Sequence, residues 1–183
     1  MNETFDSFLQ FVDLYGPRLV AAIIAGAIIG FEGEMYEKPS GFRTNILITL
    51  GSALLSIISI IAAQTYGGEA TRIAAQIVTG IGFIGAGVIV HYRYHVQGIT
   101  TAATIYVNAA IGITVGYGYI YSGVAIALVV FLILVFLRSV DALIDGSKLF
   151  RKFRQADALR QERRRDVSRE KSKRSEEEKV EAE

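Results

Sequence analysis

The chain has 183 residues, a formal net charge of +1 and no cysteine, and 51% of its residues are hydrophobic. Charge is unevenly distributed, because positions 138–183 hold 14 Lys and Arg and 11 Asp and Glu, against 5 and 7 in all preceding positions. This asymmetry excludes a soluble globule with an evenly charged surface, and the lack of cysteine excludes disulfides, thiol catalysis and cysteine-based zinc sites. The composition predicts a membrane domain over residues 14–145 and a charged tail over residues 146–183.

The first 13 residues have an amphipathic pattern that is too polar to cross a bilayer. Apolar side chains at Phe5, Phe8, Leu9 and Val12 fall on one helical face. The segment 1–13 is therefore predicted to lie in the membrane interface, with a frayed terminus as the alternative. Its acidic start lacks the basic region of a secretory signal.

The first membrane helix is predicted over residues 14–31, with Pro17 in its first turn. Ala22, Gly26 and Gly30 recur at every fourth position, which is the spacing of a small-residue seam against a neighbouring helix. A loop over residues 32–43 and a second, uncharged helix over residues 44–63 follow.

The third predicted helix covers residues 72–90 and is rich in glycine. Its uncharged part, residues 73–90, is 18 residues long and would nearly span a hydrocarbon core of roughly 30 Å. Small residues let membrane helices approach closely, so this segment is predicted to be the central, tightly surrounded helix of the bundle. The same residues spell G-x-G-x-x-G, but that pattern binds a dinucleotide only where a strand ends and a helix begins. A nucleotide site is therefore rejected.

Residues 94–137 contain no Asp, Glu, Lys or Arg, and the run of 44 residues is too long for one transmembrane helix. Glycine and tyrosine between positions 116 and 123 predict a turn, which separates helices over residues 99–115 and 119–137. The fold class is thus an all-α polytopic membrane bundle of about five transmembrane helices. Lys and Arg gather on the side that carries the tail, which predicts the N-terminus outside and the C-terminus in the cytoplasm.

The tail is basic up to position 174 and acidic from position 175 onwards. Its first part, residues 147–156, has a basic amphipathic pattern and is predicted to lie on anionic lipid. The alternative is a solvated, partly disordered charge run. A nucleic-acid partner is not expected beside a membrane.

No pattern of catalytic residues is present, so the protein is predicted not to be an enzyme and to need no cofactor or bound metal. His91 and His95 are four positions apart but have no nearby carboxylate to complete a metal site. Polar groups at membrane depth are costly and indicate either an ion path or bonds between helices. The polar candidates are Glu32, Glu34, Arg43, Asn45, Arg72, Gln76, Thr101 and Asn108. The candidates for helix packing are Gly26, Gly30, Gly80, Gly82, Gly85, Gly87 and Gly112.

Three motifs stand in order within residues 14–137. They are PSGFRTN from Pro39 to Asn45, RIAAQIVTGIGFIGAGVI from Arg72 to Ile89, and GITTAA from Gly98 to Ala103. Together they resemble the MgtC/SapB family of bacterial inner-membrane proteins. Two positions depart from the family pattern, because Gly33 stands where an arginine usually follows the glutamate and Tyr106 stands where tryptophan is common. The tail is also too short for the folded cytoplasmic domain of longer members.

This resemblance implies a multi-pass protein of the bacterial inner membrane, linked to magnesium-limited growth and, in pathogens, to virulence. It implies a regulatory role through helix–helix contacts with other membrane proteins, such as an ATP synthase or a cation pump, or within a homo-oligomer. The alternative hypothesis is a small channel or transporter for an inorganic cation.

Overall fold

The computed structural model describes residues 2–92 and 95–145. Its elements in chain order are α1 (Asn2–Met35), α2 (Phe42–Tyr66), α3 (Thr71–Gly87), β1 (Val90–Tyr92), β2 (His95–Gln97), α4 (Ile99–Gly116) and α5 (Ile120–Asp145). Five helices thus make up nearly all of the described chain, which confirms the all-α prediction.

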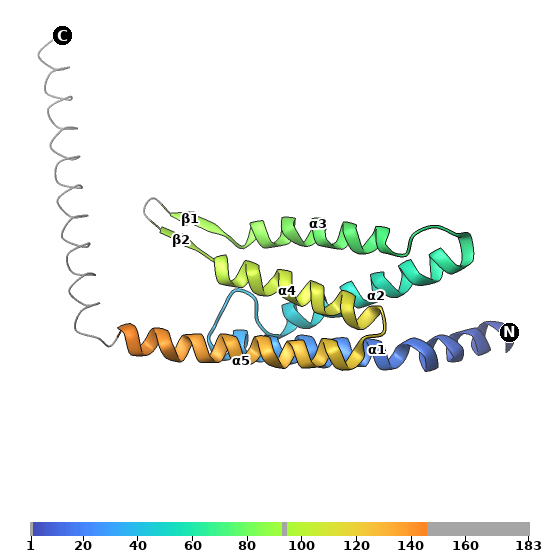
Figure 1. The fold of residues 1–183 in the computed structure, drawn as a ribbon, viewed down its shortest axis with the longest axis horizontal. Helices are drawn as coiled ribbons and strands as arrows, with labels where there is room; N and C mark the ends of the chain where they lie inside the picture. The colour runs from blue at the N-terminus through green and yellow to red at the C-terminus, as the bar shows by residue number, and fades with distance from the viewer. Residues whose placement is uncertain (1, 93–94, 146–183) are drawn as a thin grey trace, which may run out of the picture. The chain divides into compact units, whose positions relative to one another are not determined.

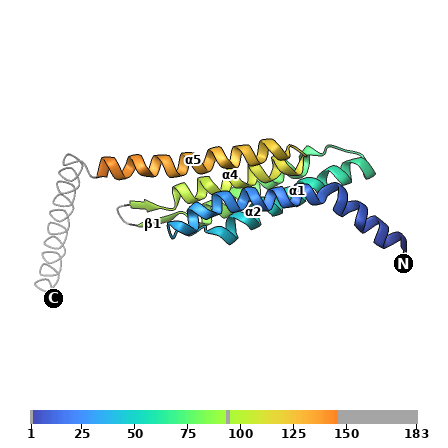
Figure 2. The same ribbon diagram turned by 90° about the horizontal axis from the view of Figure 1, so that it is seen from below.

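Successive helices run in opposite directions within the compact unit Met1–Val135 (Figures 1 and 2). The α1–α2 loop and the β-hairpin therefore lie at one end of the bundle. The α2–α3 and α4–α5 turns lie at the other end. A second unit begins at Phe136, and the structure describes only the last turns of α5 within it.

Among the described residues, four helices are long and apolar enough to cross a membrane, by length and composition. They are Phe5–Met35, Phe42–Tyr66, Ile99–Gly116 and Ile120–Val140. Helix α3 has 17 residues, one short of the shortest of these segments. The third of the five predicted spans therefore corresponds to the shortest of the described helices.

Helix α1 begins much earlier than the predicted first span. The segment 1–13, predicted to be separate, forms from Asn2 onwards a continuous helix with the rest of α1, and Pro17 lies inside it. Proline lacks an N–H and clashes with the preceding turn, which bends a helix without necessarily ending it. Figure 2 shows the N-terminal part of α1 bent away from the remainder. An interfacial position for this segment stays a prediction.

A short antiparallel hairpin joins α3 to α4 where the sequence predicted only a loop. Val90 pairs with Gln97 and His91 with Val96, so the hairpin continues the reversal of direction between the two helices. Gly98 ends it with a φ of 90°, in the left-handed region that favours glycine. A Cβ at this position would also collide with the carbonyl of Val88.

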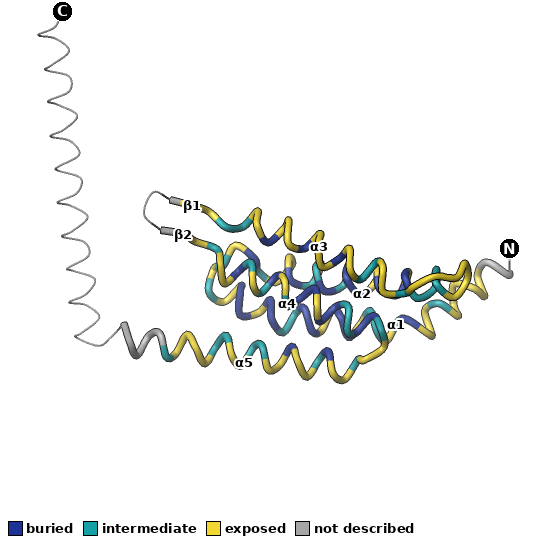
Figure 3. The backbone as a smooth tube through the Cα atoms, turned by 45° about the horizontal axis from the view of Figure 1, so that its top comes forward, coloured by how far each residue is buried: buried dark blue, intermediate teal, exposed yellow. Residues whose placement is uncertain are grey.

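The core is built mainly from small side chains on α1, α2 and α4. One buried cluster joins Ala22 and Ala25 of α1 to Ala53 of α2 and Val115 of α4, and also takes in Ala127 of α5. A second, smaller cluster joins α3 to α4. Figure 3 shows burial concentrated on α1, α2 and α4, whereas α3 and α5 expose most of their surface.

Candidate functional site

A stripe of polar side chains runs along the buried face of α2. Its members recur at intervals of three and four residues, which places them on one side of a helix. They are Asn45, Thr49, Ser52, Ser56 and Ser59, and all are buried. Only Asn45 of these five residues was predicted from the sequence as a polar candidate. The spacing could have revealed the other four, but serine and threonine also occur singly throughout membrane helices.

Glycines of α1 and α4 lie against this stripe and bring the backbones close together. A Cβ on Gly26 of α1 would stand 2.8 Å from the Cα of Ile46, and one on Gly116 of α4 would stand 2.6 Å from the carbonyl oxygen of Ala53. Gly30 and Gly112 make equally close approaches to α2. The predicted packing role of Gly26, Gly30 and Gly112 agrees with these contacts. We call this α1–α2–α4 contact the polar seam.

Hydroxyl groups within the polar seam bond mostly to their own helix. Thr49 donates to the carbonyl of Asn45 at 2.9 Å, and Ser56 donates to that of Ser52 at 2.8 Å. Such bonds satisfy the hydroxyls without water. With glycine contacts on either side, the helices approach one another closely along the seam.

Two asparagines link α2 to α4 inside the polar seam. The Nδ2 of Asn108 donates to the Oδ1 of Asn45 at 2.5 Å, and the Nδ2 of Asn45 donates to the carbonyls of Ser40 at 3.1 Å and Gly41 at 2.8 Å. The amide of Asn45 thereby ties the α1–α2 loop and α4 to the start of α2. Within the described residues, the Oδ1 of Asn108 and the Oγ of Ser40 are buried without a hydrogen-bond partner.

A buried ion pair lies at the same end of the bundle, in the last turns of α1. Glu32 is 1% exposed, and the ammonium of Lys38 donates to both of its carboxylate oxygens at 2.6 and 2.7 Å. The neighbouring Glu34 accepts the backbone N–H of Phe42 at 3.1 Å. That bond places a carboxylate at the N-terminus of α2, where negative charge is favourable.

The opposite end of the bundle is fastened through carbonyl groups. Ser59 of α2 and Tyr117 after α4 both donate to the carbonyl of Ala70, at 2.5 and 2.6 Å. Arg18 donates to the carbonyl of Gly116 at 2.9 Å and lies over the ring of Tyr15. A cation at the C-terminus of α4 complements the helix dipole.

Helix α3 is not surrounded by the other helices, so the prediction that it is central is wrong for the single chain. Within the described structure, a Cβ on Gly80, Gly82 or Gly87 would meet no atom within 4 Å. Gly85 is the exception and lies against Ala102 of α4. The reason is geometric, because α3 contacts α2 and α4 along a narrow isoleucine edge and turns its other sides outwards.

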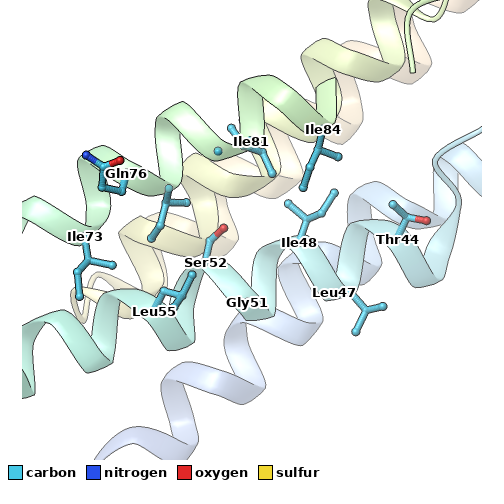
Figure 4. A pocket seen from close by; sticks show the side chains of 12 residues that line it. Thr44, Leu47, Ile48, Gly51, Ser52, Leu55, Ile73, Gln76, Ile81 and Ile84 are labelled. Carbon is cyan, nitrogen blue, oxygen red and sulfur yellow. The ribbon is translucent and has the colours of Figure 1, made fainter. Parts of the chain in front are cut away.

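A groove of about 620 Å³ lies between α2 and α3. Figure 4 shows Ile73, Ile81 and Ile84 of α3 facing α2 across it, with Ile48 opposite. Its lining is almost wholly apolar, and Gln76 of α3 and Ser52 of α2 contribute polar groups. The groove therefore presents a mainly apolar surface between α2 and α3.

The structure separates the predicted polar candidates into two groups. Glu32, Asn45 and Asn108 lie in the polar seam or at its end, with Glu34 beside them, and Thr101 is buried on α4. Arg43 and Gln76 are exposed, and Arg72 is 83% exposed beside Glu69. These residues do not form one path. Sequence analysis also missed the pairing role of Lys38.

Antiparallel helices of membrane-spanning length and apolarity define the chain as a multi-pass membrane protein. The MgtC family model matches residues 19–143. The chain belongs to the MgtC family, as the three sequence motifs predicted.

Curated relatives match more than half of the chain. The "Putative magnesium transporter YhiD" of Escherichia coli (strain K12) is 45% identical over 113 residues, covering 58% of this chain and 53% of that protein. Protein MgtC of Salmonella typhimurium (strain LT2) is 40% identical over 113 residues, covering 62% and 48%. The match therefore spans about half the length of these relatives. No solved structure matches the chain.

Proposed function

We propose that this protein is a non-catalytic regulator in the bacterial inner membrane, linked to magnesium-limited growth, that acts by packing α3 against another membrane protein. The observation that carries the proposal is the exposed glycine face of α3. We define this α3 face as Gly82, Phe83 and Gly87, which lie outside the lining of the α2–α3 groove.

The rest of the chain indicates what such glycines do. In the polar seam, glycines contact the backbone of α2 directly, as expected for membrane helices that associate through small residues. The glycines of the α3 face have no such neighbour within the described chain, and Phe83 between them is 84% exposed. A helix from a second protein would supply the missing contact. The occupant is a helix of a cation pump, an ATP synthase or a second copy of this chain.

The link to magnesium rests on family membership and on the name of the Escherichia coli relative. The inner-membrane location, the outside N-terminus and the cytoplasmic C-terminus belong to the same proposal. The predicted lipid contact of the basic tail falls on residues 147–156, outside the described residues.

Photo-cross-linking in intact membranes tests the proposal. A photoreactive side chain at Phe83 is expected to form a discrete adduct with a membrane protein, identified by mass spectrometry as a partner or a second copy. Gly82→Leu should reduce that adduct and impair growth in limiting magnesium, because a large side chain prevents close approach. Ser122→Leu on the exposed start of α5 is the matched small-to-large control. Adducts with lipid alone, with normal growth of Gly82→Leu, would contradict the proposal.

Cation transport is the second candidate function. It is favoured by the polar stripe, which runs along most of α2 with Glu32 near one end. The close glycine contacts count against it, because an ion could pass only if the helices separated. Flux of Mg²⁺, K⁺ or H⁺ into proteoliposomes, lost on Glu32→Gln, would support transport. Proteoliposomes that pass none of these ions would exclude it for these cations.

A further inference from the structure

The corner between α1 and α2 holds a carboxylate whose neutralising partner can be exchanged. Glu32 is 1% exposed, and a buried carboxylate requires a cation or several donors beside it. Within the described residues, the ammonium of Lys38 forms the ion pair with this carboxylate. Any other cation that reached the corner would meet the same negative charge.

Lys38 is placed so that its ammonium can move away from Glu32 while its backbone stays in place. Its side chain is 20% exposed, and it stands on the short loop before α2. Its backbone is held separately, because its N–H donates to the carbonyl of Gly33 at 2.9 Å. A lysine side chain is flexible and its ammonium is strongly hydrated, so exchange with water at the membrane boundary is accessible.

Two buried oxygen atoms, one in the α1–α2 loop and one on α4, lack hydrogen-bond partners within the described residues. They are the Oγ of Ser40, in a residue that is 3% exposed, and the Oδ1 of Asn108, in a residue that is 0% exposed. Asn45 connects the two residues, because its Nδ2 donates to the carbonyl of Ser40 and its Oδ1 accepts from the Nδ2 of Asn108. Gly33, next to Glu32, lies against the carbonyl of Ser40 so closely that a Cβ there would collide. These contacts bring Ser40 beside the last turns of α1, which carry Glu32, and connect it through Asn45 to Asn108.

This set of oxygens has the chemistry of a hydrated divalent cation site. Mg²⁺ keeps several of its waters in proteins and is often held by one or two carboxylates. Buried oxygens without partners are suited to accept hydrogen bonds from such waters, and hard cations prefer oxygen to nitrogen ligands. The described residues contain no cluster of three His, Asp or Glu, so a tight cage of charged ligands is not the arrangement here.

We propose that the α1–α2 corner binds a hydrated divalent cation in competition with the ammonium of Lys38. Glu32 supplies the charge, and Ser40 and Asn108 receive the ion's water shell. Lys38 occupies the carboxylate when the ion is absent and is displaced when the ion is bound. This site goes beyond the proposed helix–helix function and does not depend on it, nor on transport.

Binding to the full-length protein in detergent tests the site. Mn²⁺ is titrated and the free ion is followed by electron paramagnetic resonance, with MgCl₂ as competitor. Lys38→Met is expected to bind Mn²⁺ about tenfold more tightly, as for a site whose competent fraction is about one tenth in the wild type. Mg²⁺ should compete, and Glu32→Gln added to Lys38→Met should abolish binding.

Two matched controls separate a built site from general charge attraction. Arg43→Met removes one exposed positive charge at the same end of the bundle, and Glu34→Gln removes the neighbouring carboxylate. Neither should change Mn²⁺ affinity by more than about twofold, since both charges are exposed and screened. An equal gain in Arg43→Met and Lys38→Met, or no gain in Lys38→Met, would overturn the proposal.

The Lys38→Met chain could also fail to fold in Na⁺ because its buried carboxylate is unpaired. Helix content, measured by circular dichroism, then shows whether Mg²⁺ restores folding of the Lys38→Met chain. Recovery in MgCl₂, and not in NaCl of equal ionic strength, supports the site. Failure in both salts overturns it.

Discussion

The polar seam and the α3 face are both rich in glycine, yet their glycines have opposite surroundings. A Cβ on Gly26 or Gly112 would collide with α2, whereas one on Gly82 or Gly87 would enter open space in the single chain. The difference teaches that glycine in a membrane helix indicates close approach but not the partner. In the polar seam the partner is the same chain. On the α3 face we propose that it is another molecule.

The largest expected effect is that of a methyl group added inside the polar seam. Gly112→Ala places a Cβ against the carbonyl of Thr49 and the Cβ of Ser52, and backbone cannot move aside cheaply. The free energy of unfolding should fall by about 3 kcal/mol, at the upper end of the usual cost of overpacking. Unfolding in mixed micelles with increasing SDS, followed by circular dichroism, measures it. An unchanged transition would mean that the seam is looser than the structure describes.

The asparagine link between α2 and α4 should contribute less. Asn108→Leu removes the donor to Asn45 and leaves the Oδ1 of Asn45 buried without that bond. The expected loss is about 1 kcal/mol, within the range measured for hydrogen bonds between membrane helices. The same SDS titration measures the loss, and a double-mutant cycle with Asn45→Ala isolates the pair from the other bonds of Asn45. A coupling energy of zero would show that the bond between Asn45 and Asn108 does not stabilise the contact of α2 with α4.

A smaller effect is expected where α3 is fastened to the rest of the bundle. Tyr117→Phe removes one of the two hydroxyls that bond the carbonyl of Ala70, and Ser59 keeps the other bond. The unfolding free energy should fall by about 0.5 kcal/mol. Ser59→Ala combined with Tyr117→Phe should cost more than the sum of the single changes, because the carbonyl then loses both donors. Simple additivity would show that water replaces them freely.

The smallest loss of stability is expected for a substitution on the α3 face. Gly82→Ala meets no neighbouring atom, so the SDS transition should stay unchanged or rise by less than about 1 kcal/mol from helix propensity. The comparison between the two glycine groups fails if Gly82→Ala destabilises the isolated protein as much as Gly112→Ala does. Gly26→Ala is the additional reference from the seam and should behave like Gly112→Ala.

Much of the fold could be predicted from the sequence because the bilayer constrains it strongly. Uncharged runs located all five helices, and the turn at Tyr117 fell within the predicted break. The small-residue spacing on α1 also predicted a seam with a neighbouring helix, and the structure shows that this helix is α2. The start of α1 was predicted too late, because Asp and Glu side chains lower hydropathy without preventing a helix. The hairpin before Gly98 was missed because two three-residue strands leave no periodic pattern.

The candidate site was harder to predict, since it depends on which faces meet. Glu32, Asn45 and Asn108 were identified because charge and amides are rare in apolar helices. Arg43, Arg72 and Gln76 carry equally polar groups, yet they are exposed. Lys38 received no role, because its distance from Glu32 depends on the fold of a six-residue loop.

By itself, the sequence determined that this chain is a membrane protein of the MgtC family with apolar, glycine-rich helices. The length of hydrophobic segments and the presence of short motifs are local properties, so they can be recognised in the sequence alone. Only the tertiary structure decided that the polar stripe of α2 is buried and that Gly82 and Gly87 of α3 have no neighbouring helix in the single chain. Helix packing is a relation between distant segments, and a glycine has the same identity whether or not another backbone lies against it.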